Sequence, residues 1–469
     1  MTNTLPGISS FWDREILPTL IEYITIPALS PDFDADWAVN GQLEKTRQMA
    51  IDWIERQAEP DWIIHDLEIQ ALTPLILVEI PGSCDRTVLM YGHLDKQPEM
   101  EGWRNGFGPW KPIIENDKLY GRGGADDGYA LFAAVAAVKA LGQHDKEHAR
   151  IVILIEFSEE SGSPDLPPYL EKYGHIIGTP DLVIALDSGT GDYDRLWSTT
   201  SLRGMQGCTV TVQTLHEAAH SGIASGIVPE SMDIMRQLLD RLEDAATGKV
   251  LLEALYVDIP QIRCQQARQT AEILGLSMVE GLHPLPGLSP LSSDPYELIL
   301  NNSWRPTLCV VGQDGLPPVS RAGNVMRAYT SLKLSFRLPP PVRCEEAKRI
   351  IEQAVLRDPP LGAQIDIRFD QGGDGWEAPE PAPWLLDACD HASLQHYGHQ
   401  AAYLGLGASI PFMKMLGDSY PDAQFLITGV LGPGSNAHGP NEFLHIPYAK
   451  RLTACVADIL ASHCQATNI

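Results

Sequence analysis

Four short segments of this 469-residue chain are apolar nearly throughout instead of alternating apolar with polar residues. They are TVLMYG (87–92), RIVILIEF (150–157), DLVIALD (181–187) and QFLITGV (424–430). Strands of this kind are buried on both faces, which is typical of a parallel sheet covered by helices. The Ala-rich segment 129–141 between the first two is long enough to form the helix of a βαβ crossover. The sequence therefore predicts an α/β fold.

The middle of the chain follows a different pattern. Segments 207–214 and 328–338 alternate polar with apolar residues, as strands do when one face of their sheet is wet. Two stretches frame this section, 198–204 and 370–383, and their composition suits hinges that few contacts cross. A chain of this length is also too long for a single core. We expect an inserted domain of residues 200–375 within a first domain made of residues 1–199 and 376–469.

The charge balance excludes several kinds of partner. Lys and Arg number 34 and Asp and Glu 61, so the formal net charge is −27, which repels nucleic acid and anionic membrane surfaces. The N-terminus resembles no secretory leader, and no apolar run approaches the roughly 18 residues that span a bilayer. The eight cysteines are scattered without a C-x-x-C pair, which predicts reduced core thiols. We expect a cytoplasmic protein that binds neither nucleic acid nor membranes.

Each predicted core strand is followed by side chains of the kind that bind metal ions. Ligands of open α/β sheets bind beyond the carboxyl ends of the strands, so these side chains should converge in one crevice. Buried carboxylates and imidazoles in such a crevice are costly unless cations compensate them. Imidazole and carboxylate without thiolate suit Zn²⁺, and this set can hold two ions if one carboxylate bridges them. The groups are His93 and Asp95, Asp126 and Asp127, Glu159 and Glu160, Asp187, and His438.

Taken singly, these groups have simpler explanations, such as helix capping by Asp126 and Asp127. Their shared position at strand ends favours a common site.

A separate H-E-x-x-H sequence, residues 216–220, has the spacing of a zincin motif, which requires one helix through both histidines. Because a predicted strand leads into it and SGIASG follows it, we expect this match to be accidental. Dinucleotide, phosphate-loop and serine-elbow motifs are absent from the sequence, which argues against redox enzymes and serine hydrolases.

Short motifs in a fixed order extend this picture from about residue 10 to 463. They are YGHLDKQPE (91–99), KLYGRGGADDG (118–128), EFSEESGSPD (156–165), ALDSG (185–189), LRG (202–204), AHSG (219–222), SFRLPPP (335–341), ASIP (408–411) and NAHGPNE (436–442). In them the chain resembles the dinuclear-zinc peptidase family of carnosinases and other dipeptidases, glutamate carboxypeptidases, aminoacylases and succinyl-diaminopimelate desuccinylase. The resemblance implies a phosphorylase/hydrolase-like catalytic domain with a largely parallel, helix-covered sheet and an inserted α+β lid and dimerisation domain.

The resemblance also implies which residues hold the metal ions. His93 and Asp187 are expected to hold one Zn²⁺, Glu160 and His438 the other, and Asp126 to bridge both. This gives two Zn²⁺ per subunit, and Mn²⁺ or Co²⁺ would suit the same ligands.

Further roles follow from the same resemblance. Glu159 corresponds to the general base that takes a proton from the attacking water. Asp95 corresponds to the carboxylate that orients the imidazole of His93. The peptide bond between Asp126 and Asp127 is expected to be cis.

The inserted domain is expected to contribute to substrate binding. By resemblance, His220 reaches the active site of the partner in a homodimer and stabilises the oxyanion. Arg337 corresponds to the residue that binds a substrate carboxylate, for which a planar guanidinium is suited. Asn324 and Ser409 match weaker substrate-contact positions.

These inferences predict a zinc-dependent hydrolase that cleaves dipeptides or short peptides. An N-acyl-amino-acid deacylase is the alternative within the family, and a non-catalytic metal- or ligand-binding homologue is the alternative outside enzymes. Gly128 stands where the family commonly has Lys, and Gly405-Leu406 where related dipeptidases often have Arg-Glu. These departures concern recognition of the substrate and leave the metal ligands unchanged.

Overall fold

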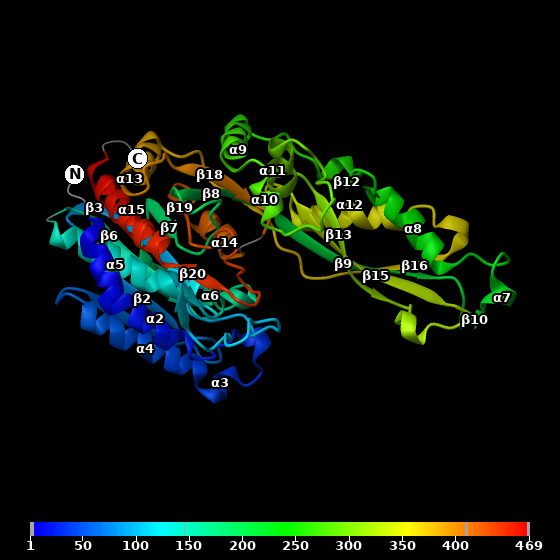
Figure 1. Ribbon diagram of the computed structural model, residues 1–469, viewed down its shortest axis with the longest axis horizontal. Helices are drawn as coiled ribbons and strands as arrows, with labels where there is room; N and C mark the ends of the chain where they lie inside the picture. Colours follow the sequence, from blue (N-terminus) through cyan, green and yellow to red (C-terminus); the bar gives the residue numbers. More distant parts are fainter. Residues whose placement is uncertain (1–3, 145, 409–410, 467–469) are drawn as a thin grey trace.

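The chain consists of a larger body and an elongated arm (Figure 1). The computed structural model describes residues 4–144, 146–408 and 411–466. The body is built on a six-stranded sheet in the order β1-β2-β6-β3-β7-β19. Its strands are β1 (Ile63–Leu67), β2 (Leu75–Ile80), β3 (Cys84–His93), β6 (Ala149–Glu156), β7 (Leu182–Ala185) and β19 (Gln424–Ile427).

Four strands of this sheet are parallel to one another, and the β1-β2 hairpin adds an antiparallel edge. The parallel strands are the four that the apolar segments predict, so the prediction of a largely parallel sheet is confirmed. Helix α5 (Tyr129–Gln143) connects β3 to its parallel neighbour β6 and forms the expected βαβ unit.

Helices cover both faces of the six-stranded sheet. Alternate residues along β3 enter different cores: Val88 and Met90 pack with one set of helices, and Leu89 and Tyr91 with another. This explains why the strand sequences are apolar at successive positions. The first face is covered by α1 (Leu5–Phe11), α2 (Leu17–Ile24), α4 (Gln42–Gln57), α5, α13 (Pro383–His396) and α15 (Ile446–Gln465), and the second by α6 (Leu166–Ile177) and α14 (Pro411–Ser419).

Two small sheets complete the body. One contains β4 (Ile113–Glu115), β5 (Lys118–Tyr120) and β20 (Phe443–His445). The other contains β8 (Trp197–Leu202), β17 (Trp376–Glu377) and β18 (Ala402–Leu406), with β8 in the centre. Every residue of β8 is buried. Most of the stretch 198–204, whose composition suggested a hinge that few contacts cross, is therefore a central strand whose small polar residues pair with strands on both sides.

The arm contains a four-stranded antiparallel sheet in the order β13-β15-β9-β16. Residues of β9 and β15 alternate between a core and the opposite, more exposed face, as the alternating sequences predict. The core is closed by two amphipathic helices. These elements are β9 (Gly204–Gln213), β13 (Thr307–Asp314), β15 (Tyr329–Leu338), β16 (Gln364–Phe369), α8 (Ser231–Leu242) and α12 (Cys344–Leu356).

Part of the middle section packs against the body instead of the arm sheet. The Oγ1 of Thr270 in α9 (Gln261–Leu274) donates to the carbonyl of Tyr403 in β18 at 2.6 Å. Helix α9 packs with α11 (Pro295–Ser303) around Ile299 and Trp304 in a separate small core. The domain boundaries at 199/200 and 375/376 stay a prediction.

The remaining short elements lie in loops of the body and the arm. Those that are α-helices or strands are α3 (Trp37–Asn40), α7 (Ser221–Ala224), α10 (Ser277–Glu280), β10 (Ala219–His220), β11 (Glu243–Asp244), β12 (Lys249–Val250) and β14 (Val325–Met326). Within the described ranges, none of the helices has the length and apolar character needed to cross a membrane.

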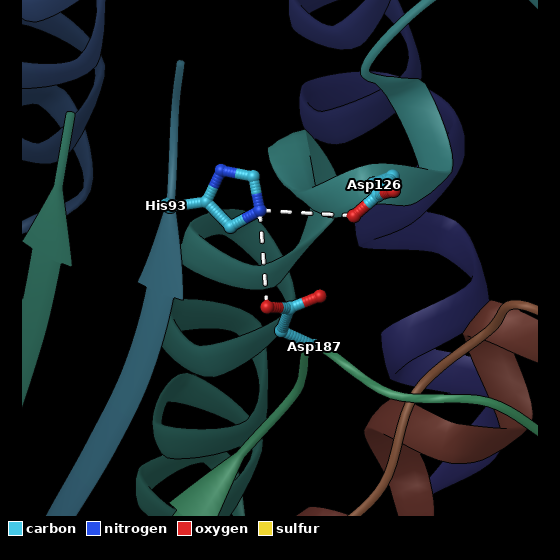
Figure 2. Close-up of side chains that lie close together, drawn as sticks. All are labelled: His93, Asp126 and Asp187. Atoms are coloured by element: carbon cyan, nitrogen blue, oxygen red, sulfur yellow. Dashed lines mark ion pairs between the residues drawn. The ribbon is translucent and has the colours of Figure 1, made fainter. Parts of the chain in front are cut away.

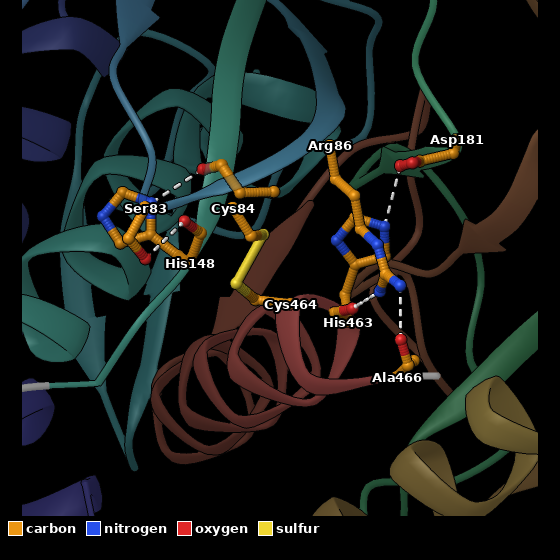
Figure 3. The surroundings of a disulfide bond; sticks show 9 residues. Ser83, Cys84, Arg86, His148, Asp181, His463, Cys464 and Ala466 are labelled. Carbon is orange, nitrogen blue, oxygen red and sulfur yellow. Dashed lines mark hydrogen bonds and ion pairs between the residues drawn. A yellow bond between two sulfur atoms is a disulfide. The ribbon is translucent and has the colours of Figure 1, made fainter. Parts of the chain in front are cut away.

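The cysteines differ from the sequence prediction. Cys84, at the start of β3, forms a disulfide with Cys464, near the end of α15 (Figure 3). Cys309 is exposed. The expectation of eight reduced core thiols is therefore wrong, because a pairing across 380 residues leaves no local spacing signal. Disulfides are more typical of oxidising compartments, and the cytoplasmic location stays a prediction.

Candidate metal centre

The predicted ligands come from five separate segments that meet at one edge of the six-stranded sheet. His93 ends β3, and Asp187 lies two residues after β7. Glu160 lies in the short turn after β6, and Asp126 in the turn that precedes α5. His438 lies in the loop between β19 and β20. Because β6, β3, β7 and β19 are parallel, their carboxyl ends bring these segments together.

His93, Asp126 and Asp187 form the first group (Figure 2). The Nε2 of His93 lies 3.7 Å from Asp126 Oδ1 and 3.8 Å from Asp187 Oδ2. This nitrogen is buried and makes no hydrogen bond within the described part of the chain. A buried ring nitrogen that faces two carboxylates without bonding to them fits a cation between the three side chains.

Asp126, Glu160 and His438 form the second group. The Nε2 of His438 lies 3.0 Å from Asp126 Oδ2 and 3.2 Å from Glu160 Oε2. Asp126 therefore directs one carboxylate oxygen to each histidine. This is the arrangement that a carboxylate shared by two metal ions requires.

The electrostatics of the two groups favour bound positive charge. Burial lowers the pKa of His438, but its hydrogen bonds with Asp126 and Glu160 outweigh burial and raise the pKa to about 11. Burial raises the pKa of Asp187 to about 7, because little water is left to solvate the charged carboxylate. Divalent cations would compensate these carboxylates, so the donor set fits metal ions on both geometry and charge.

Asp95 contacts the first group through the Nδ1 nitrogen of His93. Its Oδ1 is 3.3 Å from His93 Nδ1, and its two oxygens accept the backbone N–H groups of Glu159 and Glu160 at 3.1 and 3.0 Å. The same carboxylate therefore contacts a predicted ligand and the turn that carries two further predicted residues.

Glu159 is turned toward the first group. Its Oε2 lies 3.9 Å from His93 Nε2. Burial, reinforced by the charge of Asp187, holds the pKa of Glu159 well above its ordinary value. The peptide bond between Asp126 and Asp127 is cis, as expected.

Two features of this centre were missed in the sequence. The Nε2 of Gln97 donates to Glu160 Oε2 at 2.7 Å. Arg122 and Glu442 form a buried ion pair between the loops that carry Asp126 and His438. These three residues, Gln97, Arg122 and Glu442, lie inside the motifs that carry the family resemblance. Nothing in the spacing of the residues indicates which atoms they contact.

The structure places the residues predicted in the inserted section on the arm. His220 and Asn324 lie next to each other, since Ser221 N–H donates to the carbonyl of Asn324 at 3.0 Å and β10 pairs with β14. Both residues are exposed. Strand β10, which contains His220, lies at the far end of the arm from the body (Figure 1). Arg337 is half-buried in β15, opposite Thr307 of β13. Ser409 lies outside the described residues.

The H-E-x-x-H sequence lacks the helix that a zincin site needs. Residues 214–218 contain no helix, and Ala219 and His220 form the short strand β10. His216 is therefore not on a common helix face with His220, which confirms that the sequence match is accidental.

Position 128 has no room for a side chain. A Cβ atom at this position would lie 2.2 Å from the ring of Tyr23 and 2.6 Å from the carbonyl oxygen of Gly123. The buried Tyr23 ring thus occupies the space that a side chain at position 128 would need.

Comparisons with known proteins identify the family and the fold of the chain. The family model described as "Peptidase family M20/M25/M40" matches residues 89–462. A cysteinylglycine-S-conjugate dipeptidase of Corynebacterium striatum is 25% identical, with 86% of this chain and 89% of the relative covered. A Cys-Gly metallodipeptidase of Saccharomyces cerevisiae is 28% identical, with 91% of each covered. The solved structure of a dipeptidase from Saccharomyces cerevisiae superposes with a TM-score of 0.77 at 22% identity over 99% of both chains, which confirms the fold.

Proposed function

The chain belongs to the M20/M25/M40 peptidase family, and from this premise we propose that it is a dinuclear-zinc dipeptidase. One observation carries the proposal. Asp126 presents Oδ1 to His93 and Oδ2 to His438, so one buried carboxylate joins two groups of potential ligands. This arrangement is what a pair of closely spaced metal ions needs.

The ligand assignment follows the two groups. His93 and Asp187 would hold one ion, Glu160 and His438 the second, and Asp126 both. Neither group includes a cysteine, and the mixture of imidazole and carboxylate suits Zn²⁺, with Mn²⁺ or Co²⁺ as substitutes. When bound, such ions lower the pKa of a water molecule and polarise the carbonyl of the substrate.

Glu159 supplies the acid and base chemistry in this proposal. Its carboxylate faces the first group without belonging to either group. It accepts the proton of the attacking water and passes it to the leaving nitrogen as the amide bond breaks. Asp95 holds the turn of Glu159 and the imidazole of His93 in one orientation, since it contacts both.

The substrate is bound by residues outside the metal groups. Arg337 grips the C-terminal carboxylate of the peptide with its planar guanidinium. His220 and Asn324 act at the active site of the partner subunit, where His220 stabilises the oxyanion. Their exposed position at the far end of the arm supports this arrangement and a homodimer formed through the inserted domain. Ser409 is assigned a weaker substrate contact by resemblance alone.

The substrate class is dipeptides or short peptides cleaved before their C-terminal residue. The named activities of the relatives, which are dipeptidases acting on Cys-Gly and its conjugates, support this choice over N-acyl amino acids. A non-catalytic homologue would have no need of a carboxylate placed like that of Glu159.

The experiment measures metal content per chain together with hydrolysis of a panel of dipeptides and N-acyl amino acids. We expect two ions per chain and turnover of dipeptides that is faster than turnover of the acylated amino acids. One ion per chain, or no turnover with Zn²⁺ or Mn²⁺ present, would overturn the proposal. Faster cleavage of N-acyl amino acids would replace the dipeptidase with a deacylase.

A further inference from the structure

Arg122 and Glu442 form an ion pair with almost no exposure to solvent, at 1% and 0% of their surfaces. The pair joins Arg122 Nη1 to Glu442 Oε2. The second carboxylate oxygen, Oε1, accepts the N–H of Gly123 at 2.9 Å. Arg122 also donates from Nη2 to the carbonyl of Gly439 at 3.0 Å and from Nε to that of Pro98 at 3.2 Å. All these partners belong to loops around the metal centre.

These bonds link two of the three segments that carry the second metal group, namely those of Asp126 and His438. Gly123 lies three residues before Asp126, and Gly439 directly follows His438. The loops are 320 residues apart in sequence at the ion pair. The Arg122–Glu442 pair thus connects the backbone beside Asp126 with the backbone beside His438.

Among the predicted ligands, His438 is the one whose position depends most on the conformation of its loop. Its side chain is 54% exposed, whereas those of Asp126, Glu160, Asp187 and His93 are exposed by less than a tenth. Its φ of +63° lies in the left-handed region, which costs free energy for residues other than glycine and persists only where neighbours hold it. An exposed imidazole on such a loop is placed by whatever fixes the loop.

We infer that the Arg122–Glu442 pair positions His438 and thereby sets the affinity of the second metal site. This inference rests on the proposed function and adds two positioning residues to it. The first site depends less on the pair, because His93 and Asp187 are placed by the ends of β3 and β7 and Asp126 is buried in the turn that leads into α5. Loss of the pair should therefore weaken one metal site and spare the other.

Two variants separate position from charge. Glu442→Asp keeps the carboxylate charge but shortens the side chain, so its bonds with Arg122 and Gly123 cannot both be made. The double variant Arg122→Gln with Glu442→Gln removes both charges together and leaves no unpaired buried ion. Glu115→Gln is the matched control, since Glu115 and Arg104 form an exposed pair at 3.1 Å in the same small region of the body.

The experiment titrates each metal-free protein with Mn²⁺ and measures bound ions per chain by equilibrium dialysis and by electron paramagnetic resonance. We expect wild type and Glu115→Gln to bind two ions with a signal from coupled pairs. We expect both position 442 variants to bind the first ion as wild type does and the second about 10- to 100-fold more weakly, with unchanged circular dichroism.

The possible results discriminate between this inference and the proposed function. Wild type that binds a single ion refutes the dinuclear site and the inference with it. Wild type that binds two ions, together with variants that bind both equally well, refutes the inference alone. Equal weakening of both sites would assign the pair a general structural role and also refute the inference.

Discussion

The carboxylate of Asp95 lies 3.3 Å, measured from Oδ1, from the Nδ1 of His93. The other ring nitrogen of His93, Nε2, faces the carboxylates of the metal centre. The same carboxylate accepts the N–H groups of Glu159 and Glu160. It therefore connects the predicted metal ligand His93 with the turn that carries Glu159, the proposed general base. Asp95→Asn keeps one acceptor and loses the charge. We expect kcat to fall about 10- to 100-fold, measured with a dipeptide substrate at saturating Zn²⁺. Asp66→Asn, which changes an exposed carboxylate that pairs with Arg47, should leave kcat unchanged.

Glu159→Gln tests the general base directly. The amide keeps the size of the side chain but cannot accept a proton, so we expect kcat to fall about 10²- to 10⁴-fold. Metal content should stay at the wild-type value, because Glu159 belongs to neither group of ligands. Steady-state kinetics and elemental analysis on the same sample check both parts. Undiminished kcat would remove Glu159 from the mechanism.

The sequence predicted the parts of this molecule that repeat a local pattern. The four buried strands and helix α5 follow from hydrophobic periodicity, and the meeting of His93, Asp126, Asp187, Glu160 and His438 follows from the rule that parallel strands end at one edge. The predicted groups also contain Asp126 in a position between the two histidines.

Features that depend on distant pairing were not visible in the sequence. The disulfide between Cys84 and Cys464 and the ion pair between Arg122 and Glu442 each span more than 300 residues. Neither has a spacing that could indicate it, because the fold alone decides which loops meet. The stretch 198–204 was misinterpreted for a related reason: its composition suits a hinge that few contacts cross, but in β8 its Ser and Thr residues are buried between two strands.

Arg337→Met tests recognition of the substrate carboxylate. A charge-assisted hydrogen bond contributes about 1.5 to 3 kcal/mol, so KM for a dipeptide should rise by at least about tenfold. A dipeptide amide has no carboxylate to lose, and its kinetics should change little. Arg343→Gln is the control, since Arg343 is exposed and lies 3.7 Å from Asp374. Equal losses for the dipeptide and its amide would contradict the assignment.

Asp458 makes the stability of the body depend on pH. Burial raises the pKa of this carboxyl, but hydrogen bonds from His396 and Lys146, both at 2.7 Å, outweigh burial and hold the pKa below its ordinary value. A group whose pKa is lowered by folding stabilises the fold above its unfolded pKa and loses that contribution as pH falls through the folded value. The contribution should therefore be complete at neutral pH and decline below about pH 4.

Asp458→Asn should remove this contribution. We expect the free energy of unfolding at pH 7 to fall by about 2 kcal/mol, and the difference from wild type to shrink as the pH is lowered below about 4. Urea denaturation at a series of pH values measures both. Asp418→Asn, which removes the exposed partner of Lys414, should show neither effect. A difference that stays constant down to pH 3 would show that the charge of Asp458 is not its source.

His220 provides the test of the homodimer, because its strand β10 lies at the far end of the arm from the body (Figure 1). His220→Ala and Glu159→Gln should each be nearly inactive alone. If His220 acts across the dimer, a mixed dimer has one complete site: the His220→Ala chain keeps its own Glu159 and receives His220 from the partner. Random exchange of subunits in an equal mixture then restores about a quarter of wild-type activity. If His220 served its own chain, every site in the mixture would lack one of the two groups. The mixture would then stay inactive at any concentration, and the dimer would lose its catalytic role.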